Sequence, residues 1–357
     1  INHPHVGDKW CIYPSYDFQH CLVDSLENID YSLCTLEFET RRESYYWLVD
    51  QLHLWRAYVW EFGRLNITNT VMSKRKLKTL VADGAVRGWA DPRMPTIKGL
   101  RRRGFTPEGI NAFCAAISAS RTTETTIDWA RLEHFARLAL DPVAPRAFAV
   151  LDPVKVVLTN RPAHFLEALH APLFPKDPAK GARELPYQRE VFVDRRDVKA
   201  EDEPKFLGLA PGRIVSLRYA DVVHCDEVVC DEKGEVREVR CTVLGEEEKR
   251  AALAHKDRKL GSIHWLAGAK VGEEPRRGEV RLYDHLFTTK NPAAEKDWKK
   301  SLNPTSEVVV PNAMLEASLL GRKAEDHVQF ERLGYFCVDK DSREDHIVYN
   351  RTCALHS

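Results

Sequence analysis

The sequence predicts a multidomain chain of the α/β plus all-β class, with a helical part between the α/β and all-β parts. Three observations along the 357 residues predict this order. Strand and helix signals alternate over residues 1–82, and apolar residues at helical spacing dominate residues 83–146. Short β-branched runs between Pro and Gly turns fill residues 147–357. A chain of this length has room for roughly two to three domains.

Strand, helix and second strand are expected in that order in the α/β part. The run Trp-Cys-Ile-Tyr at residues 10–13 predicts a short buried strand that ends at Pro14. Residues 40–43 have the Thr-x-x-Glu pattern of a capping box, and residues 58–60 predict another strand. Loops beyond such strands hold ligands in α/β folds, although the sequence has no Gly-x-Gly-x-x-Gly or Walker motif. The apolar face of the intervening helix would consist of Tyr45, Leu48 and Leu52.

Two helix starts are marked in the helical part. Thr106 precedes Pro107, which is the preferred order of a cap and a first helical residue. Asp128 precedes a second amphipathic run. The buried faces would consist of Ile110, Phe113, Cys114 and Ile117 in one helix and Trp129, Leu132 and Phe135 in the other.

Many short strands separated by irregular loops predict barrels or sandwiches in the all-β part. Residues 161–188 carry five prolines and are expected to form a long connection across the strands. The predicted strands cover residues 154–158, 190–193, 222–229, 236–243, 263–266 and 307–310.

Composition excludes several classes of protein. The 43% apolar and 30% charged fractions are typical of a globular protein, and no run of 18 apolar residues predicts a membrane span. Nine scattered cysteines without a Cys-x-x-Cys pair favour a reducing cytosol over a disulfide framework. His224, Cys225, Cys230 and Cys241 flank a predicted hairpin turn at residues 231–234, so we expect core cysteines on strands and no structural metal.

A strong local excess of positive charge hides within a chain of zero net charge. Residues 71–105 contain ten Lys or Arg residues against only Asp83 and Asp91. A solvated basic surface is one interpretation, and a phosphate-bearing partner is the other. The second is favoured because basic clusters at residues 74–78 and 101–103 flank one short segment.

The segment Met72-Ser73-Lys74 within this region is suited to holding triphosphate. A hydroxyl, backbone N–H groups and a lysine can clamp phosphates, and the ammonium stabilises charge that develops on departing pyrophosphate. Alone, the segment also fits the start of a basic helix.

In this setting the chain resembles the glutaminyl-tRNA synthetases, which are class I aminoacyl-tRNA synthetases of the glutamate–glutamine group. The resemblance covers nearly the whole chain and consists of many short motifs in the same order. The motifs are Lys-Trp-Cys-Ile-Tyr-Pro at residues 9–14, Tyr-Asp-Phe at 16–18, Ser-Leu-Cys-Thr at 32–35, Arg-Leu at 64–65, Met-Ser-Lys at 72–74, Ala-Pro-Arg at 144–146, Ile-His-Trp at 263–265, Arg-Leu-Tyr at 281–283, Gln-Phe-Glu-Arg at 329–332 and Gly-Tyr-Phe at 334–336.

The resemblance implies a fold and a domain division. Residues 1–82 would be the second half of a Rossmann-type catalytic domain, and residues 83–146 a helical subdomain that contacts the tRNA stem. Residues 147–357 would form two β-barrels of anticodon-binding type.

The resemblance also implies ATP-dependent ligation of glutamine to its tRNA through glutaminyl-adenylate, with release of AMP and diphosphate. ATP, Mg²⁺ accompanying its phosphates, glutamine and tRNA(Gln) would be the partners, in the cytoplasm, without membrane or DNA. Two alternatives stay open: a glutamyl-tRNA synthetase of archaeal or eukaryotic type, and a non-catalytic tRNA-binding module.

Residue roles follow from the resemblance one by one. The ATP phosphates would meet Met72, Ser73 and Lys74, of which Ser73 and Lys74 would be catalytic. Adenine would lie against the backbone at Thr35, Arg64 and Leu65. The hydroxyl of Tyr16 would contact the glutamine amide, supported by Cys34 and Phe38, although a half-buried aromatic of this kind is often only structural.

The resemblance places tRNA contacts in two regions. Residues 120–127 correspond to a tRNA-contacting loop, in which hydroxyls and an arginine suit phosphates and sugars. Arg and Gln side chains in the all-β part would read splayed anticodon bases. The tRNA set comprises Arg121, Thr122, Thr123, Thr126, Arg146, Lys205, Arg218, Gln329 and Arg332.

Three departures from the family pattern limit this transfer. The His-x-Gly-His turn of the family is missing, so we expect the chain to begin inside the catalytic domain and to lack aminoacylation activity by itself. Val59 stands where glutaminyl enzymes usually carry Gln. Gly208 stands where an anticodon-reading Arg is common, which would alter recognition of one base or shift it to Lys205 or Arg213.

Overall fold

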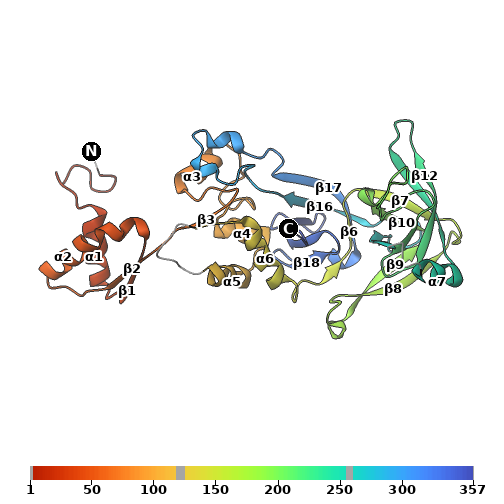
Figure 1. Ribbon diagram of the computed structural model, residues 1–357, viewed down its shortest axis with the longest axis horizontal. Coiled ribbons are helices and arrows are strands. Elements are labelled where there is room, and N and C mark those ends of the chain that lie inside the picture. The colour runs from red at the N-terminus through yellow and green to blue at the C-terminus, as the bar shows by residue number, and fades with distance from the viewer. Residues whose placement is uncertain (1–2, 118–124, 255–259, 357) are drawn as a thin grey trace. The chain divides into compact units, whose positions relative to one another are not determined.

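The computed structural model describes residues 3–117, 125–254 and 260–356, and the chain divides into two compact units (Figure 1). The first unit comprises Ile1–Thr68 and Cys114–Asp128, and the second comprises Asn69–Phe113 and Trp129–Ser357. Each unit is described by itself. The predicted α/β plus all-β class is confirmed.

A parallel pair of strands with a helical crossover forms the centre of the first unit. Strands β1 (Tyr31–Thr35) and β2 (Tyr58–Phe62) pair in parallel, so the chain must cross over between them. The crossover consists of the 3₁₀ helix η1 (Leu36–Arg41) and helix α2 (Arg42–Gln51). Helix α1 (Tyr16–Leu26) precedes β1, and its buried Cys21 packs in the same core as residues of α2 and β2.

The predicted strand at residues 10–13 is wrong. Trp10 and Ile12 are 59% and 87% exposed, and this segment is irregular up to Ser15, the N-cap of α1. An apolar run of four residues does not reveal whether a neighbouring strand exists to pair with it. The first strand of the strand–helix–strand arrangement is β1 instead.

The helix predicted after residue 40 exists, but the capping box is wrong. Arg41 occupies the N-cap of α2 with helical backbone angles, because η1 leads directly into α2. Thr40 therefore lies within a helical turn, where it cannot adopt the extended cap conformation. Tyr45 and Val49 form the buried face, and Leu52 lies just beyond the helix at 50% exposure.

Four helices and a short parallel strand pair occur among the described residues of the middle of the chain. Thr106 caps α5 as predicted, since its hydroxyl accepts from the Gly109 amide at 3.2 Å. Burial of Phe113, Trp129 and Leu132 confirms the main apolar positions, whereas Cys114 is exposed. The elements are β3 (Leu65–Ile67), α3 (Lys74–Ala82), α4 (Ile97–Arg103), α5 (Pro107–Ile117), β4 (Thr125–Ile127) and α6 (Trp129–Leu140), with β3 and β4 paired in parallel.

Within the described residues, two seven-stranded, barrel-like sheets form most of the rest of the second unit. The first barrel has the order β14-β11-β12-β13-β7-β10-β15, and the second has the order β5-β18-β19-β20-β16-β17-β6. The first consists of β7 (Pro153–Leu158), β10 (Glu190–Asp194), β11 (Ile214–Leu217), β12 (Val222–Cys230), β13 (Val236–Val243), β14 (Gly261–Ile263) and β15 (Trp265–Leu266). The second consists of β5 (Arg146–Ala147), β6 (Ala149–Val150), β16 (Arg276–Tyr283), β17 (Glu307–Leu315), β18 (His327–Phe330), β19 (Gly334–Val338) and β20 (Val348–Cys353).

One residue joins the two edges of each barrel. His264 alone separates β14 from β15, which lie at opposite edges of the first sheet. Phe148 alone separates β5 from β6 at the opposite edges of the second. A single residue spans only about 7 Å of extended chain. The two edges of each sheet must therefore come close together, which curls the sheet into a barrel.

The two crossing residues pack against each other. His264 and Phe148 are both fully buried, with ring centroids 5.9 Å apart. The imidazole Nε2 of His264 lies 2.9 Å from the carbonyl oxygen of Ala149. Phe148 also contacts the rings of Tyr219 and Trp265. We call this contact of the two crossings the barrel junction.

Residues 161–188 form a hairpin, so the predicted long connection is wrong. Strands β8 (Leu166–Pro172) and β9 (Ala182–Gln188) pair antiparallel over their whole length (Figure 1). Pro172 ends one strand and Pro186 lies within the other, so the prolines did not prevent pairing. A two-stranded ribbon tolerates proline because each strand is an edge.

The cysteines on β12 and β13 confirm the core interpretation in part. Cys225 and Cys241 face each other across the pair and are buried, whereas Cys230 is exposed. The turn at residues 231–234 is present, with Gly234 in the left-handed region. No group of three or more potential metal ligands occurs within the described residues. No helix in that part of the chain is long and apolar enough to cross a bilayer.

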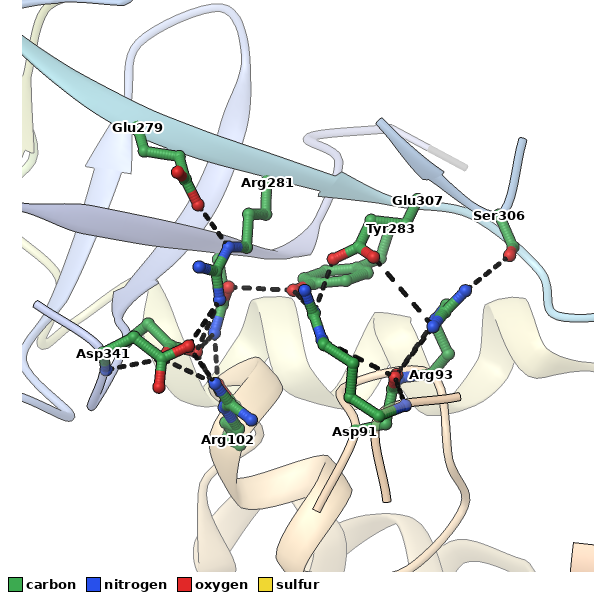
Figure 2. Close-up of polar contacts among 12 residues, drawn as sticks. Asp91, Arg93, Arg102, Glu279, Arg281, Tyr283, Ser306, Glu307 and Asp341 are labelled. Atoms are coloured by element: carbon green, nitrogen blue, oxygen red, sulfur yellow. Dashed lines mark hydrogen bonds and ion pairs between the residues drawn. The ribbon is translucent and has the colours of Figure 1, made fainter. Parts of the chain in front are cut away.

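Ion pairs tie the residues around α4 to the second barrel, as Figure 2 shows. Arg102 donates to Asp339 through Nε and Nη2 at 2.9 Å and to Asp341 at 2.6 Å. Arg281 of β16 reaches the same Asp341 at 3.0 Å. Asp91 is buried and accepts from both the backbone and the side chain of Arg93. The bonds of Arg102 connect the helical part to the barrel.

Truncation at the barrel junction should destabilise the second unit. Replacing Phe148 with alanine leaves a cavity between the two barrels, and we expect a loss of about 3–5 kcal/mol in free energy of unfolding. Urea denaturation followed by tryptophan fluorescence measures this loss. Val308→Ala on β17 is the control, because Val308 is 47% exposed. Equal stability of the two variants would show that Phe148 does not hold the junction.

Candidate functional site

A small pocket in the first unit brings together the residues predicted to contact glutamine. Tyr16 lies on α1, Cys34 on β1 and Phe38 on η1, and all three line the pocket. The ring of Tyr16 lies 5.2 Å from the ring of His20 and 5.3 Å from that of Phe38. Val59, the residue at the Gln position, also lines it. The remaining lining residues are Asp17, His20, Arg41, Arg42, Tyr45 and Glu61.

Buried polar groups surround the pocket and hold its walls. Nε2 of His20 lies 3.1 Å from the hydroxyl of Ser32 and 3.2 Å from Asp24 Oδ2. Glu61 is fully buried and accepts from both Nε and Nη2 of Arg42. Sequence reasoning missed these residues. The spacing of positions 16, 20 and 24 would have placed three polar side chains on one face of a helix.

Tyr16 and Cys34 both stay protonated near neutral pH. Partial burial raises the pKa of the Tyr16 hydroxyl, and the nearby acidic groups Cys34, Asp24 and Asp17 add to this rise. Burial likewise raises the pKa of the Cys34 thiol, together with the charge of Glu61. The pocket therefore presents a neutral hydroxyl that can both donate and accept a hydrogen bond.

The other predicted ATP residues of the first unit meet at one carboxylate. Arg64 Nη2 pairs with Glu37 Oε1 at 3.0 Å. A hydrogen bond from Thr35 and, to a smaller extent, the charge of Arg64 lower the pKa of Glu37. Leu65 begins β3 directly after Arg64. Thr35, Arg64 and Leu65 thus border one end of the β1–β2 pair, at Thr35 and Phe62.

Met72, Ser73 and Lys74 form the exposed start of α3 in the second unit. Ser73 is the N-cap residue, and its hydroxyl makes no capping bond. The first N–H groups of the helix therefore lack a side-chain acceptor, and they favour an anion. Within the described part of the chain, the Lys74 ammonium has neither a hydrogen bond nor an ion pair.

A small core fixes the base of this loop. Val71, Leu77 and Leu80 pack against Leu286 and Phe287 from the connection between β16 and β17. Lys76, in contrast to Lys74, fastens the helix to its support. Its ammonium donates to the carbonyl of Ala293 at 2.9 Å and lies over the ring of Trp298. The loop is thus exposed on a packed support.

The two basic clusters differ, which corrects the expectation that both face phosphate. In the cluster at residues 101–103, Arg103 is buried and donates to the carbonyl of Thr352. Arg101 pairs with Glu325, and Arg102 binds the aspartates of the second barrel. Much of the positive charge counted from the sequence is neutralised by acids more than 200 residues away. The cluster at residues 74–78 stays exposed at Lys74, Arg75 and Lys78.

Predicted tRNA contacts of the 120–127 loop are described only in part. Thr126 lies on β4 and is exposed. Arg121, Thr122 and Thr123 lie outside the described residues.

Two predicted anticodon-reading arginines lie beside the barrel junction. The buried carboxylate of Glu331 accepts from Arg218 Nε at 2.5 Å and from the Tyr219 hydroxyl at 3.1 Å. Arg332 directly follows Glu331 in the sequence and donates to both carboxylate oxygens of Asp197, at 2.6 and 2.7 Å. The fold thus brings together two arginines that are 114 positions apart in the sequence.

Left-handed backbone occurs at or next to three of the residues predicted to contact the anticodon. Arg332, Tyr219 and Lys205 have φ angles of 68°, 66° and 67°, in the left-handed region that non-glycine residues rarely adopt. Such conformations persist where surrounding contacts hold them, and they are frequent at functional sites. All three belong to, or directly follow, residues predicted to contact the anticodon.

The other residues predicted to read the anticodon differ in whether their side chains are already bonded within the protein. Gln329 and Arg146 are register partners on β18 and β5. The Arg146 guanidinium is buried and donates to the carbonyls of Asp141 and Ala144, so it is already engaged. Lys205 is exposed and has no hydrogen bond or ion pair among the residues that the structure describes.

The backbone around residue 208 requires a glycine, which the sequence alone did not reveal. A Cβ atom at this position would lie 2.2 Å from the carbonyl oxygen of Asp197, so the present backbone excludes any side chain. Of the two suggested substitutes for the family arginine, Lys205 is unpaired within the described chain and Arg213 is bonded to Asp202 and to the Glu203 carbonyl.

Comparison with known proteins gives three matching family models in sequence order. The model for "tRNA synthetases class I (E and Q), catalytic domain" matches residues 1–142. Two models for "tRNA synthetases class I (E and Q), anti-codon binding domain" match residues 144–244 and 262–339. The match at residues 144–244 contains most strands of the first barrel, and the match at residues 262–339 contains most strands of the second.

Curated relatives match over nearly the whole chain. The chain is 48% identical over 358 residues to the cytoplasmic glutamine–tRNA ligase of Arabidopsis thaliana, and 47% over 358 residues to glutamine–tRNA ligase of Lupinus luteus. It is 46% identical over 357 residues to glutamine–tRNA ligase of Vibrio vulnificus. Each match covers 99% of this chain, but only 44% of each plant relative and 63% of the bacterial one. The chain therefore belongs to the class I tRNA synthetases of the glutamate and glutamine group.

Proposed function

We propose that the protein containing this chain ligates glutamine to tRNA(Gln) through glutaminyl-adenylate, converting ATP to AMP and diphosphate. The observation that carries this proposal is the ordered match to one catalytic and two anticodon-binding family domains, at 46–48% identity to glutamine–tRNA ligases. The division at residues 82 and 146 and a cytoplasmic location are part of the proposal. The name of the Arabidopsis relative supports the location.

The charge balance of the Tyr16 pocket favours glutamine over glutamate. Both arginines that line it are already paired with carboxylates that also line it: Arg42 with Glu61, and Arg41 with Asp17 at 3.4 Å. His20, the third basic residue of the lining, lies beside Asp24, with 3.2 Å between its Nε2 and Oδ2 of Asp24. Each basic side chain of the lining is thus already next to a carboxylate, which disfavours a substrate carboxylate. A neutral hydroxyl suits a neutral amide, and a hydrogen-bonding site rejects analogues that leave its polar groups unpaired.

The start of α3 fits the phosphates of ATP. Its uncapped N–H groups and the Lys74 ammonium can stabilise charge that develops on the leaving diphosphate. Mg²⁺ would accompany the phosphates and neutralise them further. Thr35, Arg64 and Leu65 are proposed to contact the adenosine part of ATP.

The barrels are proposed to bind the anticodon loop, and the residues of the 120–127 segment to bind tRNA phosphates and sugars. Fixed arginines at the barrel junction support the first role, because Arg reads base edges by hydrogen bonds. The proposed contacts are Arg121, Thr122, Thr123, Thr126, Arg146, Lys205, Arg218, Gln329 and Arg332.

Replacing Lys74 with alanine in the intact protein should slow activation of glutamine. We expect the rate of glutamine-dependent ATP–pyrophosphate exchange to fall about 100-fold, because charge on the leaving diphosphate loses its stabilising ammonium. Lys78→Ala is the matched control, since Lys78 is an exposed lysine of the same helix. Equal rates for the two variants would remove Lys74 from the reaction.

Replacing Tyr16 with phenylalanine tests the pocket. Loss of one hydrogen bond to the substrate amide should raise the KM for glutamine about tenfold and leave the KM for ATP unchanged. Tyr31→Phe serves as the control because Tyr31 is 73% exposed. An unchanged KM for glutamine would assign Tyr16 a packing role only.

A further inference from the structure

The guanidinium of Arg332 is held from two sides by residues of the other barrel. We propose that Asp197 and His264 are positioning residues, which fix Arg332 so that one edge of its guanidinium reads an anticodon base. This inference rests on the proposed function and adds His264 and Asp197 to the recognition machinery.

Backbone hydrogen bonds on both sides of Arg332 constrain the loop that carries it. Arg332 is the middle residue of the three that connect β18 to β19, and Phe330 pairs directly with Gly334. The Leu333 amide donates to the Phe330 carbonyl at 3.0 Å, and the Glu331 amide donates to the Ala147 carbonyl at 3.0 Å. The left-handed conformation of Arg332 is thus maintained by bonds on both sides.

Asp197 holds the guanidinium of Arg332 from one side. Its two carboxylate oxygens accept from Nη1 and Nη2 of Arg332, which is the planar, bidentate geometry that orients a guanidinium. Asp197 ends the 3₁₀ helix η3 (Arg195–Asp197) and is itself buried. Its carbonyl packs against Gly208 so closely that a side chain there would displace it.

His264 provides the second side, and its protonation follows from its partners. The Ala149 carbonyl can only accept, so Nε2 of His264 carries the hydrogen of that 2.9 Å bond. Nδ1 is then an acceptor, and it lies 3.0 Å from Nη1 of Arg332. Burial, followed by the nearby charge of Arg332, lowers the pKa of His264 to about 4. The imidazole therefore stays neutral near pH 7 and keeps its acceptor.

These bonds leave a defined pair of donors on Arg332. Asp197 and His264 together use both hydrogens of Nη1 and one hydrogen of Nη2. Nε–H and the second Nη2–H have no partner among the described residues, and they lie parallel on one edge of the planar group. We call these two parallel donors the fork. The side chain is 31% exposed, so a ligand can reach it.

A fixed pair of parallel donors selects a ligand with two suitably spaced acceptors. A nucleobase edge and a phosphate both offer such acceptors, but only the base carries sequence information. Because Asp197 and His264 orient the guanidinium before binding, less conformational entropy is lost when the base arrives. We therefore assign the fork to a base.

The test compares two isosteric changes at His264 in the intact protein. In His264→Asn, the amide oxygen takes the place of Nδ1 and keeps the acceptor for Arg332. In His264→Gln, the amide nitrogen takes the place of Nε2 and keeps only the donor to the Ala149 carbonyl. The measured quantity is discrimination: the ratio of kcat/KM for tRNA(Gln) to kcat/KM for transcripts substituted at one anticodon position at a time.

We expect Arg332→Ala and His264→Gln each to lower discrimination about tenfold at the same anticodon position. His264→Asn should retain it, and the Arg332→Ala/His264→Gln double variant should lose no more than Arg332→Ala alone. Thermal unfolding of each variant checks that the fold is kept.

Other outcomes overturn distinct parts of the account. Equal losses of discrimination in the Asn and Gln variants would show that His264 acts only through packing. Discrimination that falls in Arg332→Ala but not in His264→Gln would refute the positioning role and keep Arg332 as a reader. Uniform weakening toward all transcripts in Arg332→Ala would assign the fork to phosphate. No effect of Arg332→Ala would remove this residue from the proposed function.

Discussion

The crossing of two single-residue connections is the constraint on which the rest of the second unit depends. His264 closes the first barrel, Phe148 closes the second, and the two rings touch while His264 bonds to Ala149. A shift of one barrel relative to the other would break these contacts. The loops that carry Arg218 and Arg332 are therefore brought to one place, although they belong to different sheets.

Buried charges set the geometry at this place. Arg183 is buried and donates to both Glu316 and Glu331, and Glu331 in turn accepts from Arg218. Burying ions is costly, and such pairs add little net stability compared with apolar packing. Their value lies in direction, because an arginine bound by two carboxylates has few alternative orientations. Together with the left-handed backbone at Arg332, this network describes a site prepared before its ligand arrives.

The sequence predicted the elements whose signals are local. The Thr106 cap and the β-branched runs gave helix α5 and most strands, and motif resemblance gave Tyr16, Cys34 and Phe38 around one pocket. Failures came from nonlocal partners. The apolar run at residues 10–13 did not show that it had no strand beside it, and no pattern revealed that Arg102 binds an aspartate 237 positions away. His264 was noted as part of a motif, but its role depended on where the barrel closes.

Hydrogen exchange of the intact protein with and without tRNA tests most directly whether the barrel junction receives the anticodon. We predict that amides at residues 218–220 and 331–333 exchange more slowly when tRNA(Gln) is bound. A tRNA whose anticodon loop is replaced by an unrelated tetraloop should leave their exchange unchanged. Full binding of tRNA(Gln) without protection at either loop would contradict the account.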